Sequence, residues 1–133
     1  MACHELFHIM YMKYILINDY SKRIVWFDEG MAQFLSGEND ELLDIERFRN
    51  FYINVRKSTK VVPNLHDMVH GNSFYNENYN GYDLSYLCIR YLNEILNEDD
   101  FKELIIQIDK IEKYSENLLL NMFEYFDKRF IIK

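Results

Sequence analysis

The stretch Cys3-His4-Glu5-Leu6-Phe7-His8, continued by the apolar run from Ile9 to Ile17, decides the structure at the start of this chain. No glycine or proline interrupts it, so it predicts a helix from Ala2 to about Leu16. Apolar residues occur nearly all round this helix, which is typical of a helix that is buried on most sides. The same helix carries two imidazoles and a carboxylate.

His4 and His8 form the pair on this helix that carries chemistry. Residues four apart project from the same face of an α-helix, so both rings can direct a nitrogen at one point. Zinc binds imidazole nitrogen at about 2.0–2.1 Å and keeps a position open for water in catalytic sites, so a further protein ligand is needed. Glu5, beside the first histidine, suits general-base work on that water. The spacing predicts a site for one zinc ion.

Length and composition limit the possible architectures and partners. The 133 residues suffice for one domain with a real core and not for two, so we expect a single unit over residues 1–133. Apolar residues make up 49% and aromatic residues 17%, which favours a compact, heavily packed fold. The net charge of -7 argues against a nucleic-acid partner or an anionic membrane and favours peptides or cationic segments.

Cysteine usage and the absence of targeting signals indicate the compartment. Cys3 and Cys88 provide no disulfide framework, which favours a reducing environment. The chain shows no signal-peptide pattern and no run of about 20 apolar residues that would span a bilayer. We therefore expect a cytoplasmic protein that does not enter the membrane.

The rest of the chain is predicted to be helical. Apolar periodicity and capping signals predict helices over residues 24–36, 39–55, 65–70, 82–96, 100–111 and 115–130. A short extended segment at 57–62 and an Asn- and Tyr-rich loop at 72–81 separate them. No strand pattern occurs, so the predicted fold class is mainly α, as a single helical domain.

Glu29 is the candidate third ligand. It lies in the second predicted helix, within Trp26-Phe27-Asp28-Glu29-Gly30-Met31-Ala32. A carboxylate among apolar side chains is costly unless it is paired or bound to a metal. Twenty residues separate His8 from Glu29, which is enough for a helix end, a loop and a return. The two helices can therefore pack side by side and present Glu29 to the histidine pair.

With His4-Glu5-x-x-His8 and the segment around Glu29, the chain resembles the gluzincin superfamily of zinc metallopeptidases. Their third ligand is a glutamate on the next helix. In the branch with zinc aminopeptidases and bacterial collagenases, it lies in a Trp-x-x-Glu-Gly-x-Ala-like segment. The resemblance implies that His4, His8 and Glu29 bind zinc. It also implies that Glu5 is the general base in the hydrolysis of peptide bonds.

Those aminopeptidases also have a tyrosine that opens a helix after a loop and stabilises the oxyanion. The matching stretch runs from Tyr82 to Leu92, where the second residue stays acidic and Ser85 replaces a glycine. The resemblance implies that Tyr82 is the oxyanion donor. The alternative is a tyrosine that caps the helix or packs in the core, and Tyr79 and Tyr86 are rival donors.

The chain departs from the gluzincin pattern at its start. Gluzincin peptidases place a β-sheet before the His-Glu-x-x-His helix, whereas three residues precede His4. The resemblance therefore covers only the C-terminal helical half of a thermolysin-like catalytic domain, and we expect the substrate-aligning sheet to be absent. An uncovered apolar side of the first helix would then mark an interface in a homo-oligomer or with an upstream domain.

Two functions follow from this departure. The first is a zinc-dependent peptidase, or the catalytic fragment of one. The second is a zinc-binding remnant without hydrolytic activity that serves as a structural or protein-interaction module. The sequence does not distinguish exopeptidase from endopeptidase activity and indicates no substrate preference.

A second histidine pair four residues apart occurs at His66 and His70. The predicted helix there is short, the intervening carboxylate is an aspartate, and no further ligand is evident. Two histidines on a solvated face are therefore favoured over a second metal site.

Overall fold

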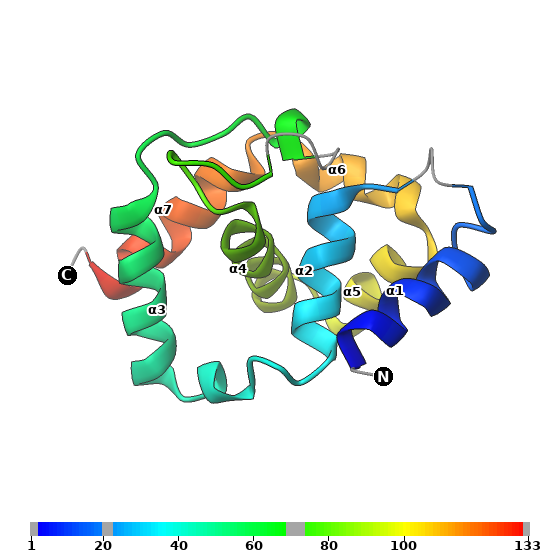
Figure 1. The fold of residues 1–133 in the computed structure, drawn as a ribbon. Coiled ribbons are helices and arrows are strands. Elements are labelled where there is room, and N and C mark those ends of the chain that lie inside the picture. Colours follow the sequence, from blue (N-terminus) through cyan, green and yellow to red (C-terminus); the bar gives the residue numbers. More distant parts are fainter. Residues whose placement is uncertain (1–2, 20–22, 69–73, 132–133) are drawn as a thin grey trace.

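The computed structural model describes residues 3–19, 23–68 and 74–131 (Figure 1). The α-helices are α1 (Cys3–Tyr14), α2 (Val25–Leu35), α3 (Ile45–Ser58), α4 (Gly81–Ile95), α5 (Glu98–Ile106), α6 (Glu112–Ser115) and α7 (Leu118–Phe130). Short 3-10 helices lie between them: η2 (Asp40–Leu43), η3 (Leu65–Met68) and η4 (Ile108–Ile111). The described residues contain no strand, only an isolated bridge between Tyr75 and Asn80. The predicted fold class, a single mainly helical domain, is confirmed.

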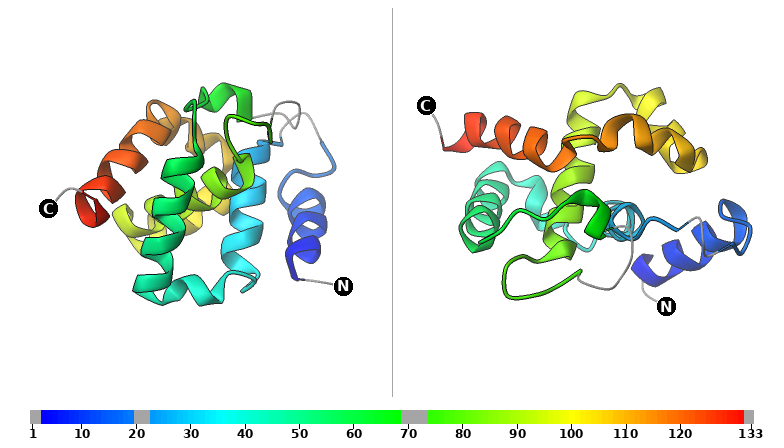
Figure 2. Two further views of the ribbon diagram at one scale, coloured as in Figure 1. Left: turned by 60° about the vertical axis from the view of Figure 1, so that its left-hand side comes forward. Right: turned by 90° about the horizontal axis from the view of Figure 1, so that it is seen from above.

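Helix α4 runs through the middle of the molecule (Figures 1 and 2). Helix α2 packs against it on one side, and α3 and α7 contact it on the other. Helix α1 lies at the edge of the molecule, beside α2. The largest side chains that are fully buried come mostly from these inner helices: Trp26, Phe27, Met31, Phe48, Tyr52, Leu84, Leu87, Ile89, Leu92 and Phe126.

Small residues allow α2 and α4 to approach closely. A Cβ atom added to Gly30 would lie 2.5 Å from Cγ1 of Ile89 and 2.6 Å from the carbonyl oxygen of Ser85. Ser85 is fully buried, and its hydroxyl donates to the carbonyl oxygen of Gly81 at 2.6 Å. The close packing at Gly30 therefore holds α2 against the centre of the fold one residue after Glu29.

The boundaries of α3 and α4 follow from side chains that cap them. Oδ1 of Asn80 accepts hydrogen bonds from the first turn of α4, which starts close to the predicted position. The helix predicted over residues 39–55 is interrupted, because Asp44 caps a new helix with its carboxylate and ends η2. Helix α3 then continues to Ser58, so the first two residues of the extended segment predicted over 57–62 are helical, and the remaining four form no strand.

The C-terminal third is more broken than predicted. The helix expected over residues 100–111 ends at Ile106 and is followed by η4 and α6. The last helix begins at Leu118 instead of near residue 115, because Asn117 adopts a left-handed conformation with φ of 56°. Asparagine tolerates that conformation better than most residues do, so a turn forms where the periodicity indicated a helix.

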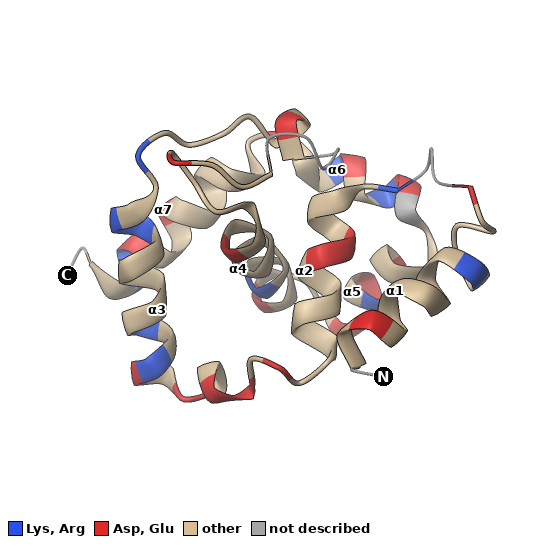
Figure 3. Ribbon diagram, in the orientation of Figure 1, with Lys and Arg blue, Asp and Glu red and all other residues tan. Residues whose placement is uncertain are grey.

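Helix α1 keeps one apolar side uncovered. Leu6, Ile9, Met10 and Tyr14 are 44%, 50%, 47% and 61% exposed, whereas Tyr11 is buried. Most of α1 carries neither acidic nor basic residues (Figure 3). Among the described helices, none combines the length and the apolar character needed to cross a membrane.

Candidate metal centre

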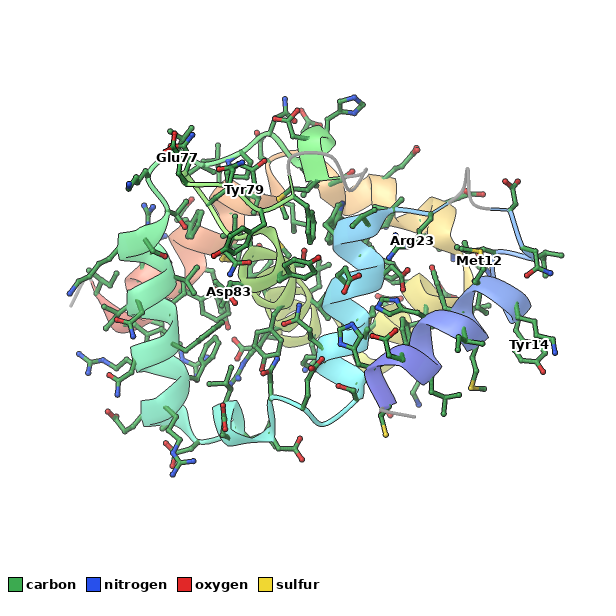
Figure 4. The ribbon with its side chains drawn as sticks, viewed as in Figure 1. Met12, Tyr14, Arg23, Glu77, Tyr79 and Asp83 are labelled. Atoms are coloured by element: carbon green, nitrogen blue, oxygen red, sulfur yellow. The ribbon has the colours of Figure 1, made fainter. Side chains whose placement is uncertain are left out.

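Helices α1 and α2 together position the candidate site. His4 and His8 lie one turn apart on α1, and Glu29 lies on α2, which packs beside it. One ligand atom from each residue lies within 4.8 Å of the others, and all three residues are partly buried. Figure 4 shows their part of the molecule, where side chains fill the space between α1 and α2. The three predicted ligands are thus brought together in a cluster that could hold a metal ion.

Both histidine rings direct Nε2 at the same oxygen of Glu29. Nε2 of His4 lies 3.2 Å from Oε2, and Nε2 of His8 lies 3.4 Å from it. The second contact lacks the alignment of a hydrogen bond, so the buried Nε2 of His8 has no hydrogen-bond partner among the described residues. Buried polar atoms without a partner are uncommon in folded proteins and need a physical explanation. A metal ion between these atoms would provide one.

The other nitrogen of each ring faces a further carboxylate. Nδ1 of His4 donates to Oε1 of Glu38 at 2.5 Å, and Nδ1 of His8 donates to Oδ1 of Asp28 at 2.8 Å. A carboxylate only accepts hydrogen bonds, so Nδ1 of each ring carries a proton. Nε2 of His4 also donates to Oε2 of Glu29 at 3.2 Å in the metal-free protein, and a metal would bind Nε2 after this nitrogen loses its proton. Histidines that bind metals usually donate their other ring nitrogen to a carboxylate or carbonyl in this way.

Arg23 completes the charge network. Its Nε donates to Oδ2 of Asp28 at 2.6 Å, and its Nη2 donates to Oε1 of Glu29 at 3.3 Å. Asp28 is 2% exposed, and a carboxylate at that depth is costly without such partners. Because Arg23 occupies Oε1 of Glu29, the carboxylate presents Oε2 to the two histidines.

These contacts change the pKa values of His8 and Glu29. The hydrogen bond to Asp28, together with the Glu29 carboxylate, raises the pKa of His8 from 6.5 to about 9, although burial opposes the shift. Burial by itself raises the pKa of Glu29, but the ion pair with His8 and the positive charges of His4 and Arg23 outweigh it and lower the pKa. In the metal-free protein, His8 is therefore protonated at neutral pH.

The raised pKa of His8 predicts that the stability of the metal-free protein depends on pH. The stabilising charge pairing is fully present below the unfolded-state pKa of 6.5 and is lost as the pH rises through about 9. For chelator-treated protein, we expect the free energy of unfolding by urea to be roughly 2 kcal/mol lower at pH 9.5 than at pH 6.5. His8→Gln should remove most of this difference. If the free energy of unfolding of His8→Gln decreased by the same amount, the pH dependence could not be assigned to His8.

Glu5 lies in the first turn of α1 and is exposed. It forms no hydrogen bond or ion pair with the residues that the structure describes. As the neighbour of His4, it is turned by about 100° around the helix axis, so its carboxylate lies beside the ligand cluster and not within it. Its role as a general base stays a prediction.

Tyr82 lies in the first turn of α4 and is 45% exposed. Its carbonyl oxygen accepts a hydrogen bond of 2.9 Å from Nε2 of Gln33, which is one turn beyond Glu29 on α2. This bond ties the start of α4 to the side of α2 that carries Glu29. Of the rival donors, Tyr79 and Tyr86 are both buried, so the exposed residue of the three is Tyr82. Its catalytic role stays a prediction.

Comparisons of the chain with models of protein families, with curated proteins and with solved structures found no match. The resemblance to gluzincins therefore depends on the residues of this chain alone. Its geometric consequence, the meeting of His4, His8 and Glu29, is present in the structure. The metal and the reaction that it implies stay predictions.

Sequence reasoning missed three residues of the site: Arg23, Asp28 and Glu38. Asp28 had a local signal, because it is a second carboxylate in an apolar helix. Glu38 reaches His4 by way of the turn at Gly37, whose φ is 79°, and Arg23 precedes α2. No local pattern marks the last two, since their partners are decided by how α1 packs on α2.

Among the described residues, His66 and the two cysteines do not belong to the ligand cluster. His66 lies in η3 and is exposed, as expected for a solvated histidine, whereas His70 lies outside the described residues. Cys3 and Cys88 are both free thiols, which agrees with the prediction that no disulfide is formed.

Proposed function

We propose that this chain binds one zinc ion through His4, His8 and Glu29 and hydrolyses peptide bonds, alone or as part of a larger peptidase. The proposal depends on the convergence of two Nε2 atoms on one Glu29 oxygen, at 3.2 and 3.4 Å. In a tetrahedral site with bonds of about 2.0–2.1 Å, ligand atoms are about 3.3–3.4 Å apart. The two distances from the histidine nitrogens to Glu29 therefore suit zinc.

The chemistry of the donor set supports the same metal. Two imidazoles and one carboxylate form a ligand set that occurs in catalytic zinc sites, where three protein ligands leave one position for water. Magnesium and calcium prefer oxygen ligands, so two histidines argue against them. Glu38 and Asp28 hold the Nδ1 protons of the two rings, which keeps Nε2 directed at the metal position.

In the proposed reaction, zinc held by His4, His8 and Glu29 would polarise the carbonyl group of the substrate and lower the pKa of its bound water toward 7. Glu5 accepts the proton of the attacking water and passes it to the leaving amine. Tyr82 donates a hydrogen bond to the developing oxyanion. The reaction forms no covalent bond between the protein and its peptide substrate.

The alternative function is a zinc-binding remnant without hydrolytic activity that serves as a structural or protein-interaction module. The uncovered apolar side of α1, with Leu6, Ile9, Met10 and Tyr14, favours it. Exposed apolar patches commonly mark contact surfaces. The proposed partners of this surface are a second copy of the chain or an upstream domain.

Reloading of the purified protein with zinc tests these proposals. The chain is stripped with a chelator, titrated with zinc by calorimetry, and then incubated with a mixed peptide pool that is followed by mass spectrometry. We expect one zinc ion per chain and new peptide fragments. Zinc binding without cleavage would support the interaction module. Absence of zinc binding would mean that His4, His8 and Glu29 form only a charge network between α1 and α2.

A further inference from the structure

A pocket of about 570 Å³ lies beside the candidate metal centre, on the Nδ1 side of His8. His8 and Asp28 form one wall of the pocket, and Glu29 and His4 do not line it. Met12 on α1 and Arg23 before α2 line it as well, and both are labelled in Figure 4. The pocket is therefore a neighbour of the metal centre and not its open coordination position.

Two cationic residues that line this pocket, Lys13 and Arg23, have unused binding capacity. Nζ of Lys13 lies over the ring of Tyr14, 5.3 Å from its centroid, and forms no ion pair with the described residues. Arg23 uses Nε and Nη2 for Asp28 and Glu29, while its Nη1 has no partner in the described ranges. A guanidinium has five N–H donors, so Arg23 retains donors for a ligand.

The side chains that line the pocket carry a net positive charge, although the chain as a whole is acidic. Its carboxylate, Asp28, already accepts from Arg23 at 2.6 Å and from His8 at 2.8 Å. The charge of Lys13 is therefore not balanced inside the pocket, although the whole chain has a net charge of -7. An anionic ligand would complement this charge, and a cationic ligand would not.

The other walls of the pocket are suited to an apolar group that belongs to the same ligand. Ile9 and Met12 contribute aliphatic surface, and Asn18 contributes an amide from the turn that follows α1. Pockets of this kind combine apolar walls with a few polar groups that orient the ligand. Guanidinium and ammonium groups bind a carboxylate by charge-assisted hydrogen bonds.

We propose that this pocket binds a carboxylate carried next to an apolar group, such as the C-terminal residue of a peptide that ends in leucine. Lys13 and Nη1 of Arg23 hold the carboxylate, while Ile9 and Met12 contact the apolar side chain. The site requires no metal, because its binding groups lie outside the predicted zinc ligands. It adds a recognition site that serves both the peptidase and the interaction module.

Calorimetry with short peptides tests this proposal on the full chain after removal of metal. The probes are N-acetyl-Ala-Leu with a free C-terminus, the same peptide as its C-terminal amide, and N-acetyl-Ala-Glu-amide. We expect the free acid to bind at least about fivefold more tightly than the amide. Tighter binding of the glutamate peptide would indicate that the carboxylate comes from an acidic side chain instead of a C-terminus.

Three variants locate the binding site. Lys13→Gln should remove the preference for the free acid, and Ile9→Glu, at a half-exposed position, should weaken binding of the free acid further by placing a carboxylate in the pocket. Lys57→Gln, on the exposed surface of α3, is the matched control and should bind as the wild type does.

Three results would overturn the proposal. They are equal affinity for acid and amide, no binding of any probe, and binding that requires added zinc. The last result would mean that the carboxylate is a ligand of the metal itself. Since the pocket is tested without zinc, its failure is distinguishable from failure of the proposed metal site.

Discussion

Replacement of His4 and His8 by alanine together is expected to lower bound zinc from about one ion per chain to about a tenth or less. The two rings supply two of the three predicted ligands, and their Nε2 atoms converge on Glu29. Both rings must be removed, because Glu38 and Asp28 lie next to them and offer replacement oxygens for a single lost nitrogen. Zinc is measured by elemental analysis after reloading and dialysis.

His66→Ala is the matched control for the loss of a histidine. His66 is exposed in η3 and lies apart from the cluster, so this variant should keep the zinc of the wild type. Circular dichroism of the double variant would show whether its helices persist. If the folded double variant bound as much zinc per chain as the wild type does, the assignment of the metal site would be wrong.

Glu5→Gln is expected to lower the rate of peptide hydrolysis by about 10²–10⁴-fold while zinc stays bound. Glutamine keeps the shape of the side chain but does not accept a proton near neutral pH. Glu5 has no hydrogen bond or ion pair among the described residues, so its replacement should disturb neither the fold nor the ligands. Hydrolysis is measured as kcat/KM on a peptide selected from the pool, and zinc is measured on the same sample.

The control for Glu5→Gln is Glu77→Gln, which makes the same change at an exposed position in the loop before α4. Its rate should equal that of the wild type. If Glu5→Gln kept full activity, Glu5 would not be the general base. If the zinc-loaded wild type itself showed no hydrolysis, the interaction module would be the better account of this chain.

Much of the helical architecture was predictable, because helix formation depends on local spacing. The apolar periodicity of residues 82–96 and 24–36 matches α4 and α2 to within a residue or two. The breaks were not predictable from periodicity. Asp44 caps a new helix inside a predicted one, and Asn117 turns the chain before α7. In both cases the conformation of one residue ends the regular helical pattern. Whether a helix breaks at such a residue depends on what the following segment packs against.

The sequence by itself identified the three residues that meet in the candidate site. Two histidines four apart on one helix must share a face, and a glutamate among apolar residues needs a partner. These inferences use only helix geometry and the cost of burying charge. They identified His4, His8 and Glu29 as residues that meet.

Only the tertiary structure decided how these residues are oriented and what surrounds them. Nε2 of each histidine faces Glu29 because Nδ1 of His8 is bonded to Asp28 and Nδ1 of His4 is bonded to Glu38. Glu38 lies 34 positions after His4 in the sequence. Arg23 joins both carboxylates of α2, and the packing of α1 on α2 leaves one apolar side of α1 uncovered. Burial and the choice of hydrogen-bond partner are long-range properties, so no local pattern in the sequence specifies them.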